Sequence, residues 1–229
     1  MSNESHPAIS HAVQDYLKAI YKLENSHEAD GSVNTKVLSE QMDVAAASVT
    51  NMVKRLAEMK LVAYTPYKGF ALTGAGEKIA LEVIRHHRLL ERYLADTLGY
   101  SWDEVDAEAD RLEHVISEEF EDRIDAALGF PTTDPHGDPI PGKDGTIKKH
   151  DTERLSEIEA GKTVVIKQVS DDSSEMLRYM DGLGLRPLAT VQVVDRAPFN
   201  GPMLVSVDQS GEHSLGLEVA GHIFVSEIA

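Results

Sequence analysis

The apolar positions at the start of the chain follow a helical period. Over 9–23 they recur at spacings of three and four, which predicts an amphipathic helix. A shorter helix is expected over 35–42, with Asn34 or Thr35 as its cap. After a tight connection at 43–44, the pattern predicts a third helix over 46–59. Two short helices joined by such a turn are typical of a helix-turn-helix.

The next segment indicates two strands. Apolar and aromatic residues flank Pro66 to Gly69, as in a strand, a turn and a second strand. A hairpin directly after a helix-turn-helix is a wing, and Lys68 would lie near its tip. The sequence therefore predicts a winged helix-turn-helix over 1–74. Such a module binds DNA or, in the alternative interpretation, protein.

In the DNA-binding interpretation, the third helix enters the major groove with its N-terminal residues toward the bases. Small side chains allow close approach, alanine methyls can touch thymine methyls, and asparagine can pair with adenine. The candidates for base contact are Ala46, Ala47, Ser48, Thr50 and Asn51. The candidates for phosphate contact, which position the protein without reading sequence, are Thr35, Lys36, Lys54, Arg55 and Lys68.

The remaining pattern predicts a mainly α protein with a small β domain. Thr73 can cap a long helix through Leu98, and Ser101 with Glu104 resembles a capping box at the start of another. The helical domain is expected over 75–145. The segment over 133–151, rich in Pro, Gly and Asp, is expected to be loop and linker. Over 151–229 we expect an SH3-like barrel with strands over 163–169, 189–194, 203–207 and 223–226 and a helix over 173–183.

The charge is unevenly divided. The whole chain has 22 basic and 39 acidic residues, a formal net charge of −17, which by itself argues against nucleic-acid binding. Residues 1–75, however, carry 7 basic and 8 acidic groups, and within 48–68 Glu58 is the one acid beside four cations. The chain has no cysteine, which excludes thiolate metal sites and fits a cytoplasmic protein. It has no apolar run long enough to cross a membrane and no signal peptide.

The excess acid is concentrated in the middle of the chain. Between Asp103 and Asp125 there are 11 acids against Arg111 and Arg123. One interpretation is a solvated acidic helix face with ordinary histidines. The other is a site for a divalent first-row metal, because histidine recurs at helical spacing from carboxylates. The candidates are the pair His87 and Glu91 and the series Asp106, Asp110, Glu113 and His114.

Four motifs, in this order along the chain, resemble one known family. They are QDYLKAIYKLE, IRHHRLLERYL, DAEADRLEHVISEE and DPHGDPIPG. Together they resemble the diphtheria-toxin-repressor family of metal-dependent transcription repressors, including its manganese-regulator branch. The resemblance extends along the whole chain. It implies a homodimer that binds a palindromic operator when Mn(II) or Fe(II) is loaded, with no membrane association and no organic cofactor.

The resemblance also implies two metal sites. The ligands of the main site would be Asp15, Asp110, Glu113 and His114, and those of the neighbouring site His87, Glu91 and Asp106. Iron-sensing members carry Met and Cys at the positions of Asp15 and Asp110. Hard carboxylates there shift the preference toward Mn(II), with Fe(II) next and other divalent transition metals binding in vitro. A metal held by Asp15 and the helical domain would fix the angle between the domains.

This chain departs from the family at several positions. Lys18 replaces a second acid of the manganese branch, and Asp106 replaces a histidine of the iron branch. Arg88, an anion-binding residue in the iron branch, is retained, but Asp134 and Asp138 replace polar neutral residues. Asp171, Asp172 or Glu175 is a candidate ligand from the C-terminal domain, against the alternative of a solvated acidic turn. No ligand role is predicted for the other histidines, His136 among them.

Three other functional classes remain as alternatives. A metal hydrolase is disfavoured because the chain has no helical HExxH, GxSxG, Walker or dinucleotide motif. A metal-buffering or transport accessory protein leaves the winged helix unexplained. A transcription factor that senses an organic ligand does not account for the acidic, histidine-bearing helix face. The sequence therefore favours a metal-dependent regulator that represses metal-uptake genes.

Overall fold

The computed structural model divides into two compact units. It describes residues 9–25, 33–65, 69–148, 151–208 and 211–228. The first unit comprises Met1–His86 with Pro141–Gly145, and the second comprises His87–Ile140 with Thr146–Ala229. The long helix α4 (Gly74–Leu98) contributes to both. In the described part of the chain, no helix has both the length and the apolar character needed to cross a bilayer.

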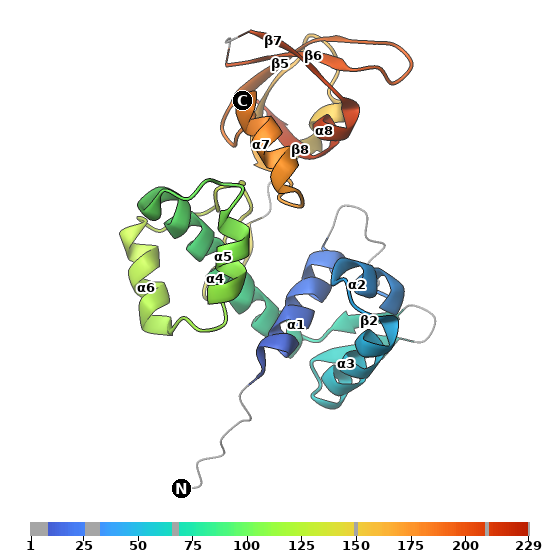
Figure 1. Cartoon of the computed structure of the whole chain (residues 1–229), viewed down its shortest axis with the longest axis vertical. Coiled ribbons are helices and arrows are strands. Elements are labelled where there is room, and N and C mark those ends of the chain that lie inside the picture. The colour runs from blue at the N-terminus through green and yellow to red at the C-terminus, as the bar shows by residue number, and fades with distance from the viewer. Residues whose placement is uncertain (1–8, 26–32, 66–68, 149–150, 209–210, 229) are drawn as a thin grey trace, which may run out of the picture. The chain divides into compact units, whose positions relative to one another are not determined.

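The first unit contains a helix-turn-helix followed by a hairpin (Figure 1). Its elements are α1 (His11–Glu24), α2 (Thr35–Gln41), α3 (Ala46–Glu58), β1 (Val62–Thr65) and β2 (Gly69–Leu72). The Asn34 side chain accepts hydrogen bonds from the backbone N–H groups of Lys36 and Val37, which confirms Asn34 as the cap of α2. The tip of the hairpin, with Lys68, lies outside the described residues.

One apolar core holds the three helices and the hairpin together. Leu17 and Ile20 of α1, Leu38 of α2, and Val49 and Leu56 of α3 are completely buried. The apolar stripes expected from the sequence therefore face one another. Because α1 packs in the same core as α2 and α3, it forms one packed unit with the helix-turn-helix.

A half-buried carboxylate also connects α1 to the hairpin. Glu24 Oε1 accepts a hydrogen bond of 2.8 Å from the backbone N–H of Leu72. Burial raises the pKa of Glu24 above its ordinary value, whereas this hydrogen bond opposes the shift. We expect Glu24→Leu to lower the free energy of unfolding by about 1–3 kcal/mol, because the Leu72 N–H loses its acceptor. Urea unfolding measures this effect. Glu24→Gln, which keeps an acceptor oxygen, should remain close to wild type, and equal losses in both variants would contradict the assignment.

The helical part of the second unit is built from the rest of α4, α5 (Val105–Leu112) and α6 (Glu118–Ala127). Its core contains Leu89, Leu90, Leu94, Val105, Ala109 and Ile124. The prediction that Ser101 begins the helix is wrong. Residues 102–104 form a turn, and the Ser101 hydroxyl donates to the Glu104 carboxylate instead of accepting from a backbone N–H. α5 also ends earlier than expected, so Glu113 and His114 follow it in a turn.

The β part of the second unit is one antiparallel sheet of six strands, in the order β3-β8-β4-β5-β6-β7. The strands are β3 (Glu153–Arg154), β4 (Thr163–Val169), β5 (Thr190–Arg196), β6 (Met203–Val207), β7 (Glu212–Leu215) and β8 (Ile223–Glu227). A 3-10 turn, η1 (Leu155–Glu157), and two helices, α7 (Ser174–Gly182) and α8 (Leu217–Gly221), accompany the sheet (Figure 1). This is the small SH3-like domain expected from the sequence, with β3, β7 and α8 as elements that the pattern missed.

Within the second unit, the helical and β parts are held together by specific contacts. Trp102 is buried in the core formed mainly by the β part. Asp103 forms an ion pair with Arg178 of α7 at 2.8 Å. The backbone N–H of Val169, at the end of β4, donates to the carbonyl of His136 at 2.9 Å. These contacts bring the turn before α5, the loop around His136 and the end of β4 into one region.

Candidate metal centre

His87 of α4 is surrounded by four carboxylates. Its Nδ1 lies 2.6 Å from Glu113 Oε2 and 3.3 Å from Asp110 Oδ1. Its Nε2 lies 3.3 Å from Asp106 Oδ1 and 3.5 Å from Glu91 Oε1. His87, Glu91 and Glu113 are almost completely buried, whereas Asp106 and Asp110 are about half exposed. The structure thus brings together five of the seven predicted metal ligands.

This arrangement concentrates more negative charge than one imidazole can neutralise. A protonated histidine carries a single positive charge, and like charges at this spacing repel one another strongly where water is excluded. His87, Asp106 and Asp110 each offer a donor atom, and these atoms lie within 4.8 Å of one another. Oxygen and imidazole nitrogen donors suit a divalent first-row cation. The residues therefore fit a metal ion.

A second group has the same chemistry. Glu91 of α4, His136 of the loop over 131–140, and Asp171 of the turn after β4 offer donor atoms within 4.8 Å of one another. His136 Nδ1 and Glu91 Oε1 are 3.6 Å apart. Asp171 is half-buried, and the other two residues are buried. Of the three candidate ligands from the C-terminal domain, Asp171 is thus the one that lies beside candidate ligands of the helical part.

The hydrogen bonds of His136 leave a lone pair pointing at a carboxylate. Its Nε2 lies 2.7 Å from the backbone carbonyl oxygen of Trp102. Since a carbonyl only accepts, Nε2 carries the hydrogen, and Nδ1 of the neutral ring is an acceptor. Neither Nδ1 nor Glu91 Oε1 has a hydrogen-bond partner in the described structure, although both are buried. Two donors that share an ion at about 2 Å lie roughly 3–4 Å apart, so this pair fits a cation.

His136 lies in this candidate group, although no ligand role was predicted for it from the sequence. Its loop was expected to be a linker, but it is ordered by local bonds: Asp134 Oδ1 accepts from the backbone N–H groups of His136 and Asp138. Gly137, with φ +92°, approaches β4 so closely that an added Cβ would lie 2.0 Å from the Lys167 carbonyl oxygen. The Asp-x-His-Gly spacing, which is typical of a side-chain-stabilised turn, was the signal available in the sequence.

Arg88 fastens the same loop to α4. Its guanidinium donates to Asp138 Oδ1 at 2.6 Å and to the Pro139 carbonyl at 2.7 Å, and it lies 3.6 Å from Asp134 Oδ2. Burial, followed by the charges of Glu91 and Asp138, raises the pKa of Asp134 well above its ordinary value, and Arg88 opposes this shift. Two carboxylates of the chain itself, Asp134 and Asp138, therefore lie beside the Arg88 guanidinium.

The other predicted ligands are placed as follows. Asp15 is half-buried on α1, in the first unit. His114 follows Glu113 after α5, with its Nε2 3.4 Å from Glu113 Oε1. Asp172 accepts from the Ser170 hydroxyl, and Glu175 is exposed in the first turn of α7. Neither Asp172 nor Glu175 belongs to a group of metal-ligating side chains in the described structure.

The predicted DNA-contacting residues of α3 form one exposed face. Val49, Val53 and Leu56 point into the core. The side chains of Ala46, Ala47, Ser48, Thr50, Asn51, Lys54 and Arg55 are exposed. On α2, Thr35 is half-buried, and Lys36 is exposed with Glu40 at 3.8 Å. The geometry thus presents small, polar and basic side chains together.

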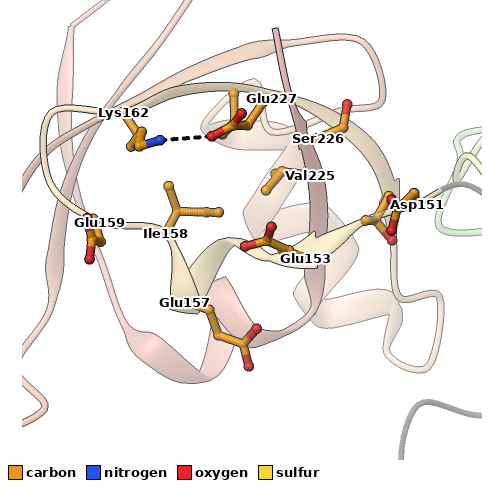
Figure 2. Close-up of a pocket in the computed structure, with 11 residues that line it drawn as sticks. Asp151, Glu153, Glu157, Ile158, Glu159, Lys162, Val225, Ser226 and Glu227 are labelled. Carbon is orange, nitrogen blue, oxygen red and sulfur yellow. Dashed lines mark hydrogen bonds and ion pairs between the residues drawn. The ribbon is translucent and has the colours of Figure 1, made fainter.

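A separate pocket of about 610 Å³ lies in the β domain, at the edge formed by β3 and β8. Figure 2 shows Glu153, Glu157 and Glu159 among its lining residues, together with the ion pair of Lys162 with Glu227, at 2.8 Å. It shares no residue with either carboxylate–imidazole group. The metal chemistry therefore lies elsewhere than this pocket.

Models of known families match three successive parts of the chain. "Iron dependent repressor, N-terminal DNA binding domain" matches 8–70, "Iron dependent repressor, metal binding and dimerisation domain" matches 73–142, and "FeoA domain" matches 153–227. The iron-dependent repressor IdeR of Mycobacterium leprae is 34% identical over 190 residues, which are 78% of this chain and 81% of that protein. The diphtheria toxin repressor of Corynebacterium jeikeium is 30% identical over 219 residues, covering 83% and 90%.

Solved structures give the same picture. A manganese-dependent transcriptional repressor in complex with manganese has a TM-score of 0.87 and 38% identity, covering 94% of this chain and all of that one. The manganese regulator SloR has a TM-score of 0.75 and 31% identity, covering 94% and 98%. The chain belongs to the diphtheria-toxin-repressor family of metal-dependent transcription repressors.

Proposed function

We propose that this protein is a DNA-binding transcriptional repressor switched on by Mn(II). The observation that carries the proposal is the pair of buried acceptors, Glu91 Oε1 and His136 Nδ1, that face each other without a hydrogen-bond partner in the described residues. A bound Mn²⁺ would place a positive charge between these two groups, next to Asp171. The proposed domains are 1–74 for DNA binding, 75–145 for metal binding and dimerisation, and the SH3-like domain over 151–229.

The choice of metal rests on the donor atoms. Both groups offer carboxylate oxygen and imidazole nitrogen, and the chain contains no cysteine. Hard oxygen donors favour Mn²⁺ relative to sites that include thiolate or thioether sulfur. A similar structure is described as a complex with manganese, whereas the mycobacterial relatives are described as iron-dependent repressors. We therefore propose Mn(II) first and Fe(II) second.

The metal order is tested by measuring DNA binding against free metal concentration. Duplexes selected from a random pool in Mn²⁺ supply the operator, and anaerobic titrations with Mn²⁺ and Fe²⁺ are compared on the same duplex. We expect half-maximal binding at a lower free concentration of Mn²⁺. Activation by Fe²⁺ at the lower concentration would overturn the order while leaving metal dependence intact.

We further propose a dimer on a palindromic site. Apolar side chains of the helical part are exposed in the single chain, namely Leu98, Tyr100, Val115, Phe120 and Phe130. Exposed apolar residues of this kind are typical of protein interfaces. The matched family domain is described as a dimerisation domain. Two copies of the α3 face would read two half-sites about one DNA turn, roughly 34 Å, apart.

The main-site ligands proposed from the family resemblance are Asp15, Asp110, Glu113 and His114. Asp15 belongs to α1, whose core contacts with α2 and α3 make it part of the DNA-binding unit. A ligand on α1 is therefore a means of coupling metal to DNA, and coupling of this kind is reciprocal.

We expect Asp15→Ala to remove metal stimulation of DNA binding and to leave the protein a folded dimer. Free Mn²⁺ for half-maximal binding should rise by at least about 100-fold, because a metal ligand is lost rather than an outer contact. Fluorescence anisotropy of the selected duplex measures the response, and light scattering checks the dimer. Glu58→Ala, an exposed acid on α3, should keep the metal response. A normal response of Asp15→Ala would rule out this ligand.

A further inference from the structure

Trp102 is the one tryptophan of the chain, and it lies beside the second carboxylate–imidazole group. Its ring stacks on that of His136, with the ring centroids 5.6 Å apart and the planes inclined by 26°. The guanidinium carbon of Arg186, from the β domain, lies 5.1 Å from the same ring. Trp102 Nε1 is buried without a hydrogen-bond partner among the described residues. Packing and ring contacts therefore hold the indole in place.

The backbone of Trp102 contributes as well. Its carbonyl oxygen accepts the Nε2–H of His136 at 2.7 Å, which leaves Nδ1 as the atom that faces Glu91. One residue thus determines both the plane of the imidazole and the nitrogen that is available as a ligand. Hydrogen bonds to the far nitrogen of a ligand histidine commonly orient the ring and increase its basicity.

We propose that Trp102 is the positioning residue of the group formed by Glu91, His136 and Asp171. The proposal rests on the proposed function, since it assumes that this group holds a cation. Glu91, His136 and Trp102 come from the helical part, whereas Asp171 and Arg186 come from the β domain. The Trp102 indole therefore contacts the candidate ligand His136 of the helical part and the guanidinium of Arg186 from the β domain.

The first test measures Mn²⁺ affinity by calorimetry in the full-length protein. We expect Trp102→Ala to weaken binding at one class of sites by about 10–100-fold, the range typical of residues that orient metal ligands. Trp102→Phe, which keeps an aromatic ring against His136, should lose less than about tenfold. Arg178→Gln is the matched control. It removes the ion pair of Arg178 with Asp103, which joins the same two parts of the unit without involving His136, and should leave affinity unchanged.

The second test uses the emission of Trp102 itself and needs no Trp102 variant. We expect Mn²⁺ to change this emission, because the indole stacks on a candidate ligand. The midpoint of the change should match the calorimetric affinity of the sites that Trp102→Ala weakens. In His136→Ala the emission should no longer respond, although Mn²⁺ still binds at the His87 group. A residue that only stabilised the fold would lower the unfolding temperature without altering affinity or this signal.

Two results would overturn the positioning role. One is wild-type Mn²⁺ affinity at all sites in folded Trp102→Ala. The other is an unchanged emission of the wild-type protein while calorimetry shows that every site is filled. Both leave the proposed function intact. A wild-type protein that binds no Mn²⁺ would instead contradict the proposed function itself.

Discussion

The variant Glu113→Gln is expected to lose metal-stimulated DNA binding almost completely. Glu113 is buried, its Oε2 lies 2.6 Å from His87 Nδ1, and its Oε1 lies 3.4 Å from His114 Nε2. Glutamine keeps the shape but removes the charge and one anionic ligand atom. Free Mn²⁺ for half-maximal DNA binding should therefore rise by more than about 100-fold, beyond the usual loss for an outer contact.

The measurement is anisotropy of a labelled, selected duplex over a series of buffered Mn²⁺ concentrations. Glu175→Gln is the control, because it makes the same chemical change at an exposed acid outside the metal-ligating groups. Circular dichroism and light scattering establish that both variants are folded and retain the dimer. If Glu113→Gln and Glu175→Gln respond to Mn²⁺ equally, Glu113 is not a ligand.

The second large effect is expected for Gly137→Ala. Gly137 has φ +92°, and an added Cβ would lie 2.0 Å from the Lys167 carbonyl oxygen and 2.8 Å from the Gln168 Cα. Both neighbours are backbone atoms of β4, so the loop must move. We expect a loss of about 2–5 kcal/mol in unfolding free energy, from backbone strain and overpacking together. The displaced His136 should also weaken Mn²⁺ binding at its group by about 10–100-fold.

Gly161→Ala separates the two contributions. Gly161 has φ +87° but no atom within 4 Å of an added Cβ. It should therefore show the loss of about 1–2 kcal/mol that a left-handed conformation imposes on alanine, with unchanged Mn²⁺ affinity. Urea unfolding and calorimetry measure both quantities. Equal behaviour of the two variants would mean that close packing of the loop on β4 does not position His136.

Much of the fold was predictable because it follows from local pattern. The stripes around Leu17, Leu38 and Val53 specify three helices, and short β-type runs predicted the bounds of β4 and β6. β7 was missed because it is four residues long, is largely polar and pairs only with β6 in the described sheet. Short edge strands leave little periodicity to detect.

The turn before α5 shows where local pattern misleads. Ser101 and Glu104 have the spacing of a capping box, yet their side chains bond to each other and the helix begins at Val105. The intervening Trp102 is buried in the core of the β part, about fifty residues or more away in sequence. A local motif could not reveal that contact, because it is made by elements that meet only in the folded unit.

Some residues of the candidate site were likewise predictable from local spacing, and others were not. His87 and Glu91 share a helix face, and the acids that follow are close enough in sequence for the pattern to suggest a cluster. His136 was missed because its approach to Glu91 and Asp171 depends on the Gly137 contact with β4 and on the Trp102 carbonyl. Both are long-range features of the second unit. Sequence spacing therefore pointed to carboxylate and imidazole groups, but it did not identify His136 as one of them.

The most direct test of the central claim is DNA binding by the wild-type protein with and without metal. Anisotropy of a selected duplex is followed while free Mn²⁺ is raised, and a chelator is then added in excess. Binding should appear as Mn²⁺ rises and disappear with the chelator. Equal affinity for the duplex before Mn²⁺, at saturating Mn²⁺ and after chelation would contradict a metal-dependent repressor.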